Sequence, residues 1–130
     1  MADTADTANN EQDALSLTLG SVIIATANPA RLKAFYCEVL GVPVNAQGRL
    51  VSGGIIIHPA YHSAVQHAPA EPYRAMLTFD TADIYASAKA LKARGVVFVR
   101  EPEQEHWGGW VATFLDPDGN YLQLLQPAPT

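Results

Sequence analysis

The chain has 130 residues, of which 48% are hydrophobic and 16% are charged, and its formal net charge is −5. This composition supplies enough apolar material for one domain with a packed core, whereas the acidic balance argues against nucleic-acid or anionic-membrane binding, which requires basic patches. No apolar stretch approaches the roughly 20 residues of a membrane-spanning helix. The single cysteine, Cys37, excludes an internal disulfide and is typical of a cytoplasmic protein.

The two ends of the chain differ in composition from the rest. Residues 1–14 are polar and acidic, with neither a basic start nor an apolar segment, so they predict a disordered tail and not a secretory signal. Residues 127–130 form a short C-terminal tail. The remaining residues, 15–126, are expected to fold as a single domain.

In the first half, residues 15–27 predict a strand. Asn28 and Pro29 then supply an N-cap and a first helical position. The helix that follows carries an apolar stripe at helical spacing and ends at Gly41; the stripe comprises Leu32, Phe35, Tyr36, Val39 and Leu40. Short apolar segments at 42–45, 49–52 and 55–58, separated by glycine turns, predict three more strands.

The second half repeats this plan after a proline-bounded loop at residues 59–72. Residues 73–79 predict a strand, and Asp83 caps a helix that runs through Arg94. Three strands follow, at 96–100, 110–115 and 121–126. Gly41 and Gly95 end the two helices at an offset of 54 residues, which indicates an internal duplication. The expected fold class is α+β, with two tandem βαβββ modules (residues 15–58 and 73–126) whose curved sheets form a cup.

The hairpin between the last two strands is the most specific stretch. Asp116 is placed to accept a hydrogen bond from the backbone two residues on, Pro117 suits the first corner of a type I turn, and Gly119 tolerates a positive φ. Strand alternation then puts Gln123 on one face with Tyr121 and Leu125. A polar amide in an apolar strand must find partners or face a wet cavity.

Several motifs, in order and at these spacings, resemble one known family. They are the hairpin Phe114–Asn120, the first-helix pattern of Asn28-Pro29, Phe35-Tyr36 and Leu40-Gly41, the second-helix end at 91–96, and Trp107-Gly108. Over residues ~15–126 the chain resembles the vicinal oxygen chelate superfamily, which includes glyoxalases, extradiol dioxygenases and bleomycin-resistance proteins. The resemblance implies a pair of βαβββ modules around a cup. It implies little about function, because this fold supports many chemistries.

The resemblance also locates the positions at which the family's metal enzymes hold their metal. In this chain those positions are Ser21, Met76 (to within one residue) and Gln123. Serine, methionine and a neutral amide are poor ligands for a catalytic divalent ion, which requires imidazole nitrogens and an anionic oxygen. We therefore expect no metal and no cofactor in the cup.

An enzyme with relocated ligands is the alternative, namely a metal-dependent glyoxalase-like lyase or isomerase, or a dioxygenase. Its ligands would come from His58, His62, His67 or Glu101. His58 and His62 are four residues apart, but Pro59 disfavours a helix there, so a helical metal-binding pair is not expected. A metal-free enzyme with His58 or Tyr121 as acid or base also stays open. No catalytic residue is assigned.

A binding protein is the favoured reading. The tryptophans of the 107–110 segment flank two glycines and offer flat apolar faces for an aromatic or cationic ligand. The expected ligand is a partly aromatic small molecule held in the cup, and the candidate ligand-binding residues are Ser21, His58, Met76, Trp107, Trp110, Tyr121 and Gln123. We also expect a homodimer, because the sheets leave uncovered edges and family members commonly pair across a two-fold axis.

Overall fold

The computed structural model describes residues 15–130, so the tail predicted at residues 1–14 lies outside the described part. The first three strands are β1 (Ser21–Thr26), β2 (Leu50–Ser52) and β3 (Ile55–Tyr61), and they form one sheet in the order β1-β3-β2. The second sheet has the order β4-β7-β6-β5, from β4 (Leu77–Asp80), β5 (Phe98–Gln104), β6 (Trp110–Leu115) and β7 (Tyr121–Gln126).

The two sheets confirm the predicted duplication. In each, the first strand pairs in parallel with the last strand, β1 with β3 and β4 with β7. On the other side of that last strand, an antiparallel strand follows: β2 beside β3 in the first sheet, and β6 beside β7 in the second. The fourth position is β5 in the second sheet, but in the first it is only an isolated bridge between Val44 and Leu50. The fold is therefore the predicted α+β pair of modules with curved sheets.

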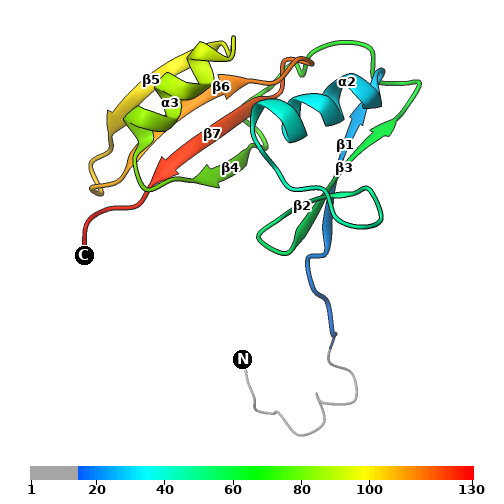
Figure 1. Cartoon of the computed structure of the whole chain (residues 1–130), viewed down its shortest axis with the longest axis horizontal. Coiled ribbons are helices and arrows are strands. Elements are labelled where there is room, and N and C mark those ends of the chain that lie inside the picture. Colours follow the sequence, from blue (N-terminus) through cyan, green and yellow to red (C-terminus); the bar gives the residue numbers. More distant parts are fainter. Residues whose placement is uncertain (1–14) are drawn as a thin grey trace, which may run out of the picture.

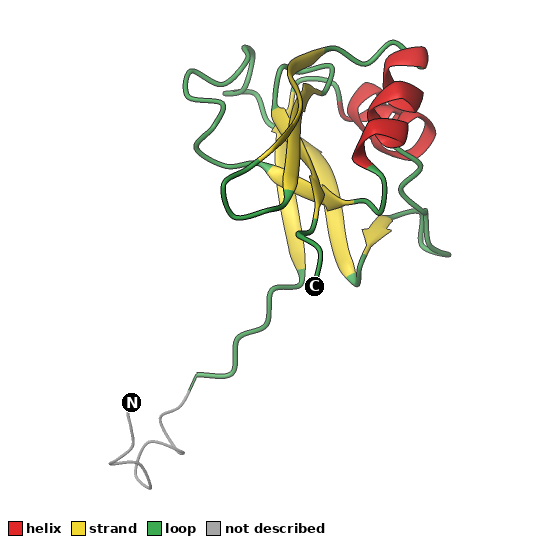
Figure 2. Ribbon diagram, turned by 90° about the vertical axis from the view of Figure 1, so that its left-hand side faces the viewer, coloured by secondary structure: helices red, strands yellow, loops and turns green. Residues whose placement is uncertain are grey.

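Helices cover one face of each sheet (Figures 1 and 2). Helix α2 (Pro29–Ala34) continues into the π-helical turn η1 (Phe35–Val39), and α3 (Ile84–Ala93) is its counterpart. Both predicted N-caps are confirmed: Asn28 accepts from the backbone N–H of Arg31, and Asp83 accepts from that of Ala86, each at 3.1 Å. Within residues 15–130 the opposite face of each sheet carries no helix, and we call it the concave face.

The strand bounds differ from the prediction at several places. β1 begins at Ser21 instead of residue 15, because its parallel partner β3 begins only at Ile55. The carbonyl of Gly20, which accepts from the backbone N–H of Ile56, is the first group of this segment that bonds to β3. Residues 42–45 contribute a bridge and not a strand. β3 runs on to Tyr61, β4 begins at Leu77 instead of residue 73, and β5 spans 98–104 instead of 96–100. The bounds predicted for β6 and β7 are confirmed.

A buried polar network ties the closing turn of the second module to the helix of the first. Asp116, which is 4% exposed, accepts from the backbone N–H groups of Asp118 and Asn120 at 2.9 and 3.0 Å. Its other oxygen accepts from the Asn120 amide at 2.8 Å and from the fully buried Tyr36 hydroxyl at 3.1 Å. Gly119 has a φ of 83°, as the turn requires. Burial raises the pKa of Asp116, although these hydrogen bonds oppose the shift.

Replacing Tyr36 with phenylalanine is expected to lower the free energy of unfolding by about 1–3 kcal/mol, because it removes a buried hydroxyl and leaves the Asp116 carboxylate with one donor fewer. Urea denaturation at neutral pH measures the loss. Tyr85→Phe is the matched control, because Tyr85 is 58% exposed, and it should change stability by less than about 0.5 kcal/mol.

The pH dependence of stability gives a second test of the Tyr36 hydroxyl. Burial, with the charge of Asp116, raises the pKa of Tyr36 well above its ordinary value of 10.0. Above pH 10.0 the unfolded chain therefore loses this proton while the native state keeps it, so the wild type loses stability as pH rises further. The Tyr36→Phe variant should lose less stability than wild type over that pH range, because it has no phenol to titrate. If the free energy of unfolding fell equally with pH in Tyr36→Phe and in wild type, the raised pKa of Tyr36 would be contradicted.

Candidate functional site

The concave faces of the two sheets carry matching mid-strand positions. Ile23 on β1 lies opposite His58 on β3, and Thr78 on β4 lies opposite Gln123 on β7. Ile23 stands five residues before its helix N-cap, Asn28, and Thr78 stands five before Asp83. The duplication thus makes Ile23 the counterpart of Thr78, and His58 the counterpart of Gln123.

Strand alternation shows that these four side chains point away from the helices. Their neighbours Ile57, Leu122 and Leu124 are buried in the core, and Ile24, Leu77 and Phe79 pack against it. Because successive side chains in a strand point to opposite faces, Ile23, His58, Thr78 and Gln123 face the concave side. His58 is exposed and Ile23 is 67% exposed, so this side of the first sheet is open.

A transverse row of polar side chains crosses the second sheet at the level of Gln123. Register places Thr78, Gln123, Thr113 and Arg100 side by side, one from each strand. The irregular register of β5 between Phe98 and Arg100 is what brings Arg100 opposite Thr113, because Phe98 pairs with the core residue Phe114. Thr113 is only 1% exposed, so the polar groups of the row that a ligand on the concave face can reach are those of Thr78, Gln123 and Arg100.

The two ends of this row differ. At one end the Gln123 amide nitrogen donates to the Thr78 hydroxyl at 3.4 Å. At the other, Arg100 is held by Glu103 at 3.1 Å and by Glu105. The only formal charges in the row therefore belong to an arginine that already has carboxylate partners, and its centre is neutral.

An aromatic pair flanks the row. Tyr121 shares the concave face with Gln123 two residues away, and its ring lies edge to face against Tyr73, with 4.8 Å between centroids. Met76 lines a hollow of about 270 Å³ together with Tyr121 and Ile23, at the junction of β1 and β4. The structure thus brings together two of the predicted ligand-binding residues, Met76 and Tyr121, next to the strand position of Gln123.

Other predicted residues lie elsewhere. Ser21 is exposed at the start of β1, opposite Ile56. Trp107 is 48% exposed on the turn between β5 and β6, where its ring covers Gly109 so closely that a Cβ there would lie 1.9 Å away. Trp110 is half-buried against the hydrophobic core, on the helix side of β6 with Phe114. The two tryptophans therefore do not lie with Gln123.

Sequence reasoning missed Thr78, Thr113 and Arg100 as members of the row. On β4 the sequence pointed to Met76, but the strand register places Thr78 opposite Gln123, two residues further along the chain. The alternation around Phe114 was a usable signal for Thr113, because a core residue at 114 puts 113 on the other face.

The concave face does not offer the donor set that a metal enzyme of this fold would require. Of its four mid-strand residues, only His58 is of a metal-ligating type. Across residues 15–130, no three His, Cys, Asp or Glu side chains are grouped so that they could hold a metal ion. The residues named for a relocated site are scattered: His62 accepts from the backbone of Ala64 in the loop, and Glu101 pairs with Lys92.

Within the described residues, no helix is both long enough and apolar enough to span a bilayer.

Comparison with known proteins agrees with this architecture. A chain of Bacillus subtilis (strain 168) called uncharacterized protein YetH is 34% identical over 103 residues, covering 79% of this chain and 76% of that protein. A bleomycin resistance protein of Klebsiella pneumoniae is 35% identical over 51 residues, covering 36% of this chain and 40% of that protein.

A crystal structure of a Glyoxalase/bleomycin resistance protein/dioxygenase superfamily member from Sphaerobacter thermophilus superposes with a TM-score of 0.70 at 25% identity, covering 86% of this chain and 98% of that one. The family model for the Glyoxalase/Bleomycin resistance protein/Dioxygenase superfamily matches residues 18–124. The chain therefore belongs to this superfamily, and the family resemblance seen in its sequence is confirmed.

Proposed function

We propose that the protein binds a partly aromatic small molecule on its concave face, without a metal ion. The observation that carries the proposal is the set of mid-strand residues, Ile23, His58, Thr78 and Gln123, which combines hydrogen-bonding and apolar groups but includes no carboxylate. Binding requires only apolar area and a few placed polar groups, and this face supplies both. The name of the Klebsiella relative, a bleomycin resistance protein, is consistent with a binding role.

The aromatic and polar residues of the site would contact different parts of the ligand. The Tyr121–Tyr73 pair presents ring faces and edges on which an aromatic group can pack. The Gln123 amide has its nitrogen directed to Thr78, and its oxygen has no protein donor among residues 15–130, so it can accept from a ligand. We infer that the ligand places its aromatic part against the tyrosines and a donor against Gln123.

The alternative, a metal-dependent lyase, isomerase or dioxygenase, has less support. His58 lies on β3, His62 and His67 lie in the loop after it, and Glu101 lies on β5 paired to Lys92. A catalytic zinc site commonly uses three protein ligands converging on one point, and within residues 15–130 these four residues do not form such a group.

A binding experiment tests the proposal. Purified protein is screened against a library of aromatic heterocycles and aromatic antibiotics, bleomycin included, by thermal shift, because a ligand of the native state must raise the unfolding midpoint. The best ligand is then titrated by calorimetry. Gln123→Leu should weaken it about tenfold, the equivalent of one lost hydrogen bond, and Tyr121→Ala should weaken it at least as much.

Tyr85→Ala is the control, because Tyr85 is exposed on α3, on the helix side of the sheet. Its affinity should match that of wild type. A ligand whose affinity is unchanged in both Gln123→Leu and Tyr121→Ala binds elsewhere, and it would contradict the assignment to the concave face.

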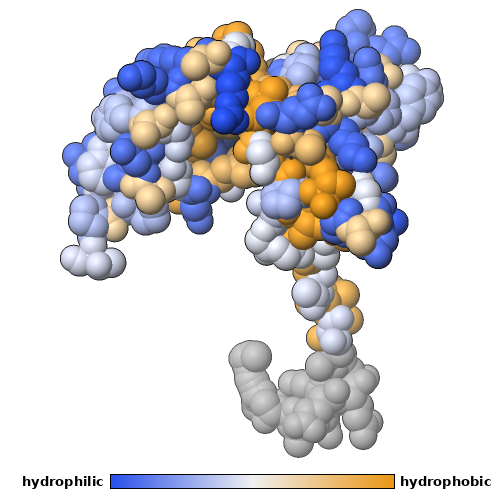
Figure 3. All heavy atoms as spheres, viewed as in Figure 1, coloured by the Kyte–Doolittle hydropathy of each residue, from blue (hydrophilic) through white to orange (hydrophobic). Residues whose placement is uncertain are grey.

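We also propose that the protein is a homodimer. Leu15, Leu17, Leu19 and Ile23 are 67–83% exposed and alternate with the strand period, so in an extended segment they share one face with Ala25. Figure 3 shows hydrophobic atoms along the segment that leads into β1, away from the body of the molecule. Exposed apolar side chains that share one face, interrupted here by Ser21 alone, mark an interaction surface, and a second copy of the chain is a partner available to every molecule.

Sedimentation equilibrium at micromolar concentration tests the dimer. Wild type should show the mass of two chains, and a variant with Leu15→Ser, Leu17→Ser and Leu19→Ser should show the mass of one. The control carries Tyr85→Ser and Val97→Ser, which remove exposed apolar side chains of the second module, and it should stay dimeric. A monomeric wild type, or a dimeric triple-serine variant, would contradict the proposal.

A further inference from the structure

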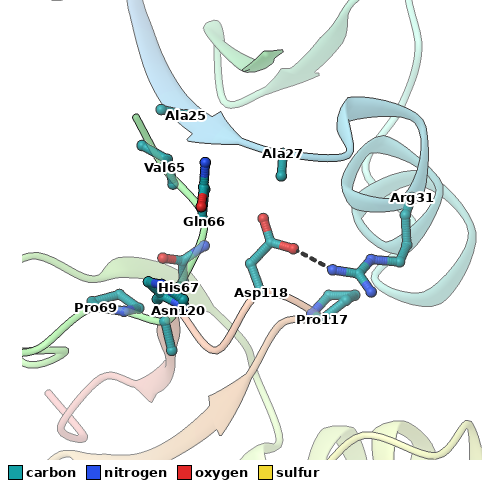
Figure 4. Close-up of a pocket in the computed structure, with 11 residues that line it drawn as sticks. Ala25, Ala27, Arg31, Val65, Gln66, His67, Pro69, Pro117, Asp118 and Asn120 are labelled. Atoms are coloured by element: carbon teal, nitrogen blue, oxygen red, sulfur yellow. Dashed lines mark hydrogen bonds and ion pairs between the residues drawn. The ribbon is translucent and has the colours of Figure 1, made fainter. Parts of the chain in front are cut away.

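A second pocket lies where the two modules meet, away from the concave-face row. Its volume is about 430 Å³, and four segments line it: the end of β1, α2, loop residues 65–69 and turn residues 117–120. We call it the seam pocket (Figure 4). None of the four mid-strand residues and none of the polar row belongs to it, so it is distinct from the proposed ligand site.

The walls of the seam pocket are held in place by direct contacts. The loop packs on the turn, because a Cβ on Gly119 would lie only 2.8 Å from the Cβ of Ala68. The turn is joined to β1 by the hydrogen bond from the Thr26 hydroxyl to Asp118, at 2.5 Å. The pocket is therefore built by segments far apart in sequence that meet through specific contacts, and it is more than a gap between loops.

Two opposite charges lie side by side in the pocket. Asp118 accepts from Nη2 of Arg31 at 2.7 Å, and the two side chains are 16% and 55% exposed. Figure 4 shows Asp118 between Arg31 on one side and the loop residues Gln66 and His67 on the other. Only one guanidinium nitrogen is used by Asp118, so Arg31 keeps further N–H donors for a ligand.

Acceptors lie beside the carboxylate. The side-chain amide nitrogen of Asn120 donates to Asp116. The side-chain oxygen Oδ1 of Asn120 accepts no hydrogen bond from the described residues, so it can accept one from a ligand. Each Asp118 oxygen accepts one hydrogen bond, from Thr26 or from Arg31, and a carboxylate oxygen can accept two. The pocket thus presents donors at Arg31 and acceptors at Asp118 and Asn120.

This arrangement selects against ligands with a single charge. An anion is attracted to Arg31 but repelled by Asp118 at nearly the same distance, and a cation meets the reverse, so either gains little. A molecule that carries both charges, in matching order, gains from both groups. We propose that the seam pocket binds a small zwitterion of the α-amino-acid type, its carboxylate on Arg31 and its ammonium on Asp118 and the side-chain oxygen Oδ1 of Asn120.

The rest of the pocket suits an apolar side chain. Val65, Pro69, Ala25 and Ala27 supply apolar wall, and the volume lies within the range of small-molecule sites. An amino acid with a large apolar side chain therefore fills more of the pocket than glycine or alanine does. The proposal does not depend on the concave-face ligand.

Calorimetric titration with three matched probes tests the charge requirement. L-phenylalanine carries both charges, 3-phenylpropionate lacks the ammonium, and phenethylamine lacks the carboxylate. We expect L-phenylalanine to bind and each half-charged probe to bind at least tenfold more weakly. Equal binding of all three probes, or binding of none of them, would overturn the proposal.

Variants locate the site. Arg31→Gln should weaken L-phenylalanine at least tenfold while leaving phenethylamine unchanged, and Arg31→Lys should restore part of the loss. Gln123→Leu, on the concave face, should have no effect on L-phenylalanine. If Arg31→Gln weakened all three probes equally, Arg31 would not act on the ligand carboxylate, and the charge match would be refuted. If only Gln123→Leu abolished binding, the zwitterion site would lie on the concave face.

Discussion

The carboxylate of Asp116 is the constraint on which the arrangement of the two modules depends. It accepts two backbone N–H groups of its own turn and, through the Tyr36 hydroxyl, it holds the helix of the other module. A group buried to this degree must have its lone pairs satisfied, so the turn and the helix cannot separate without a large cost. Strand β7 begins directly after this turn, and the position of Gln123 relative to β1 follows from it.

A duplicated fold gives one scaffold two sets of equivalent positions, and the side chains at those positions decide what the scaffold does. Here the equivalent positions are Ile23 and Thr78, on β1 and β4, and His58 and Gln123, on β3 and β7. Membership of the superfamily therefore accounts for the sheets, the helices and their order, while the chemistry has to be argued from these side chains and their neighbours. One imidazole and one neutral amide can hydrogen-bond to a ligand, but they supply too few metal-ligating groups for a catalytic metal site.

The features that the sequence predicted well are those with local causes. The Asp116–Asn120 turn, the caps Asn28 and Asp83, and the bounds of β6 and β7 all follow from chemistry within a few residues, and the structure confirms them. The duplication was legible because Gly41 and Gly95 end the two helices, both at positive φ. Periodicity likewise predicted correctly that Gln123 faces away from the buried Leu122 and Leu124.

Features set by pairing between distant strands could not be predicted in this way. Thr78 faces Gln123 only because β4 and β7 pair in one particular parallel register, and Arg100 joins the row only because β5 is irregular. The first strand was predicted too long because alternation at 15–19 looks the same whether or not a neighbouring strand is present. The seam pocket depends on Arg31 and Asp118, which are 87 residues apart.

We have proposed that the concave face recognises its ligand without a metal. Metal content of protein purified without chelator or affinity tag, together with thermal unfolding with and without Zn²⁺, Ni²⁺, Mn²⁺ and Fe²⁺, tests it most directly, because an ion that binds the native state must raise the midpoint. We expect substoichiometric metal and no stabilisation by any of these ions. Stoichiometric metal, or a clear rise with one ion that is lost in His58→Ala, would contradict it.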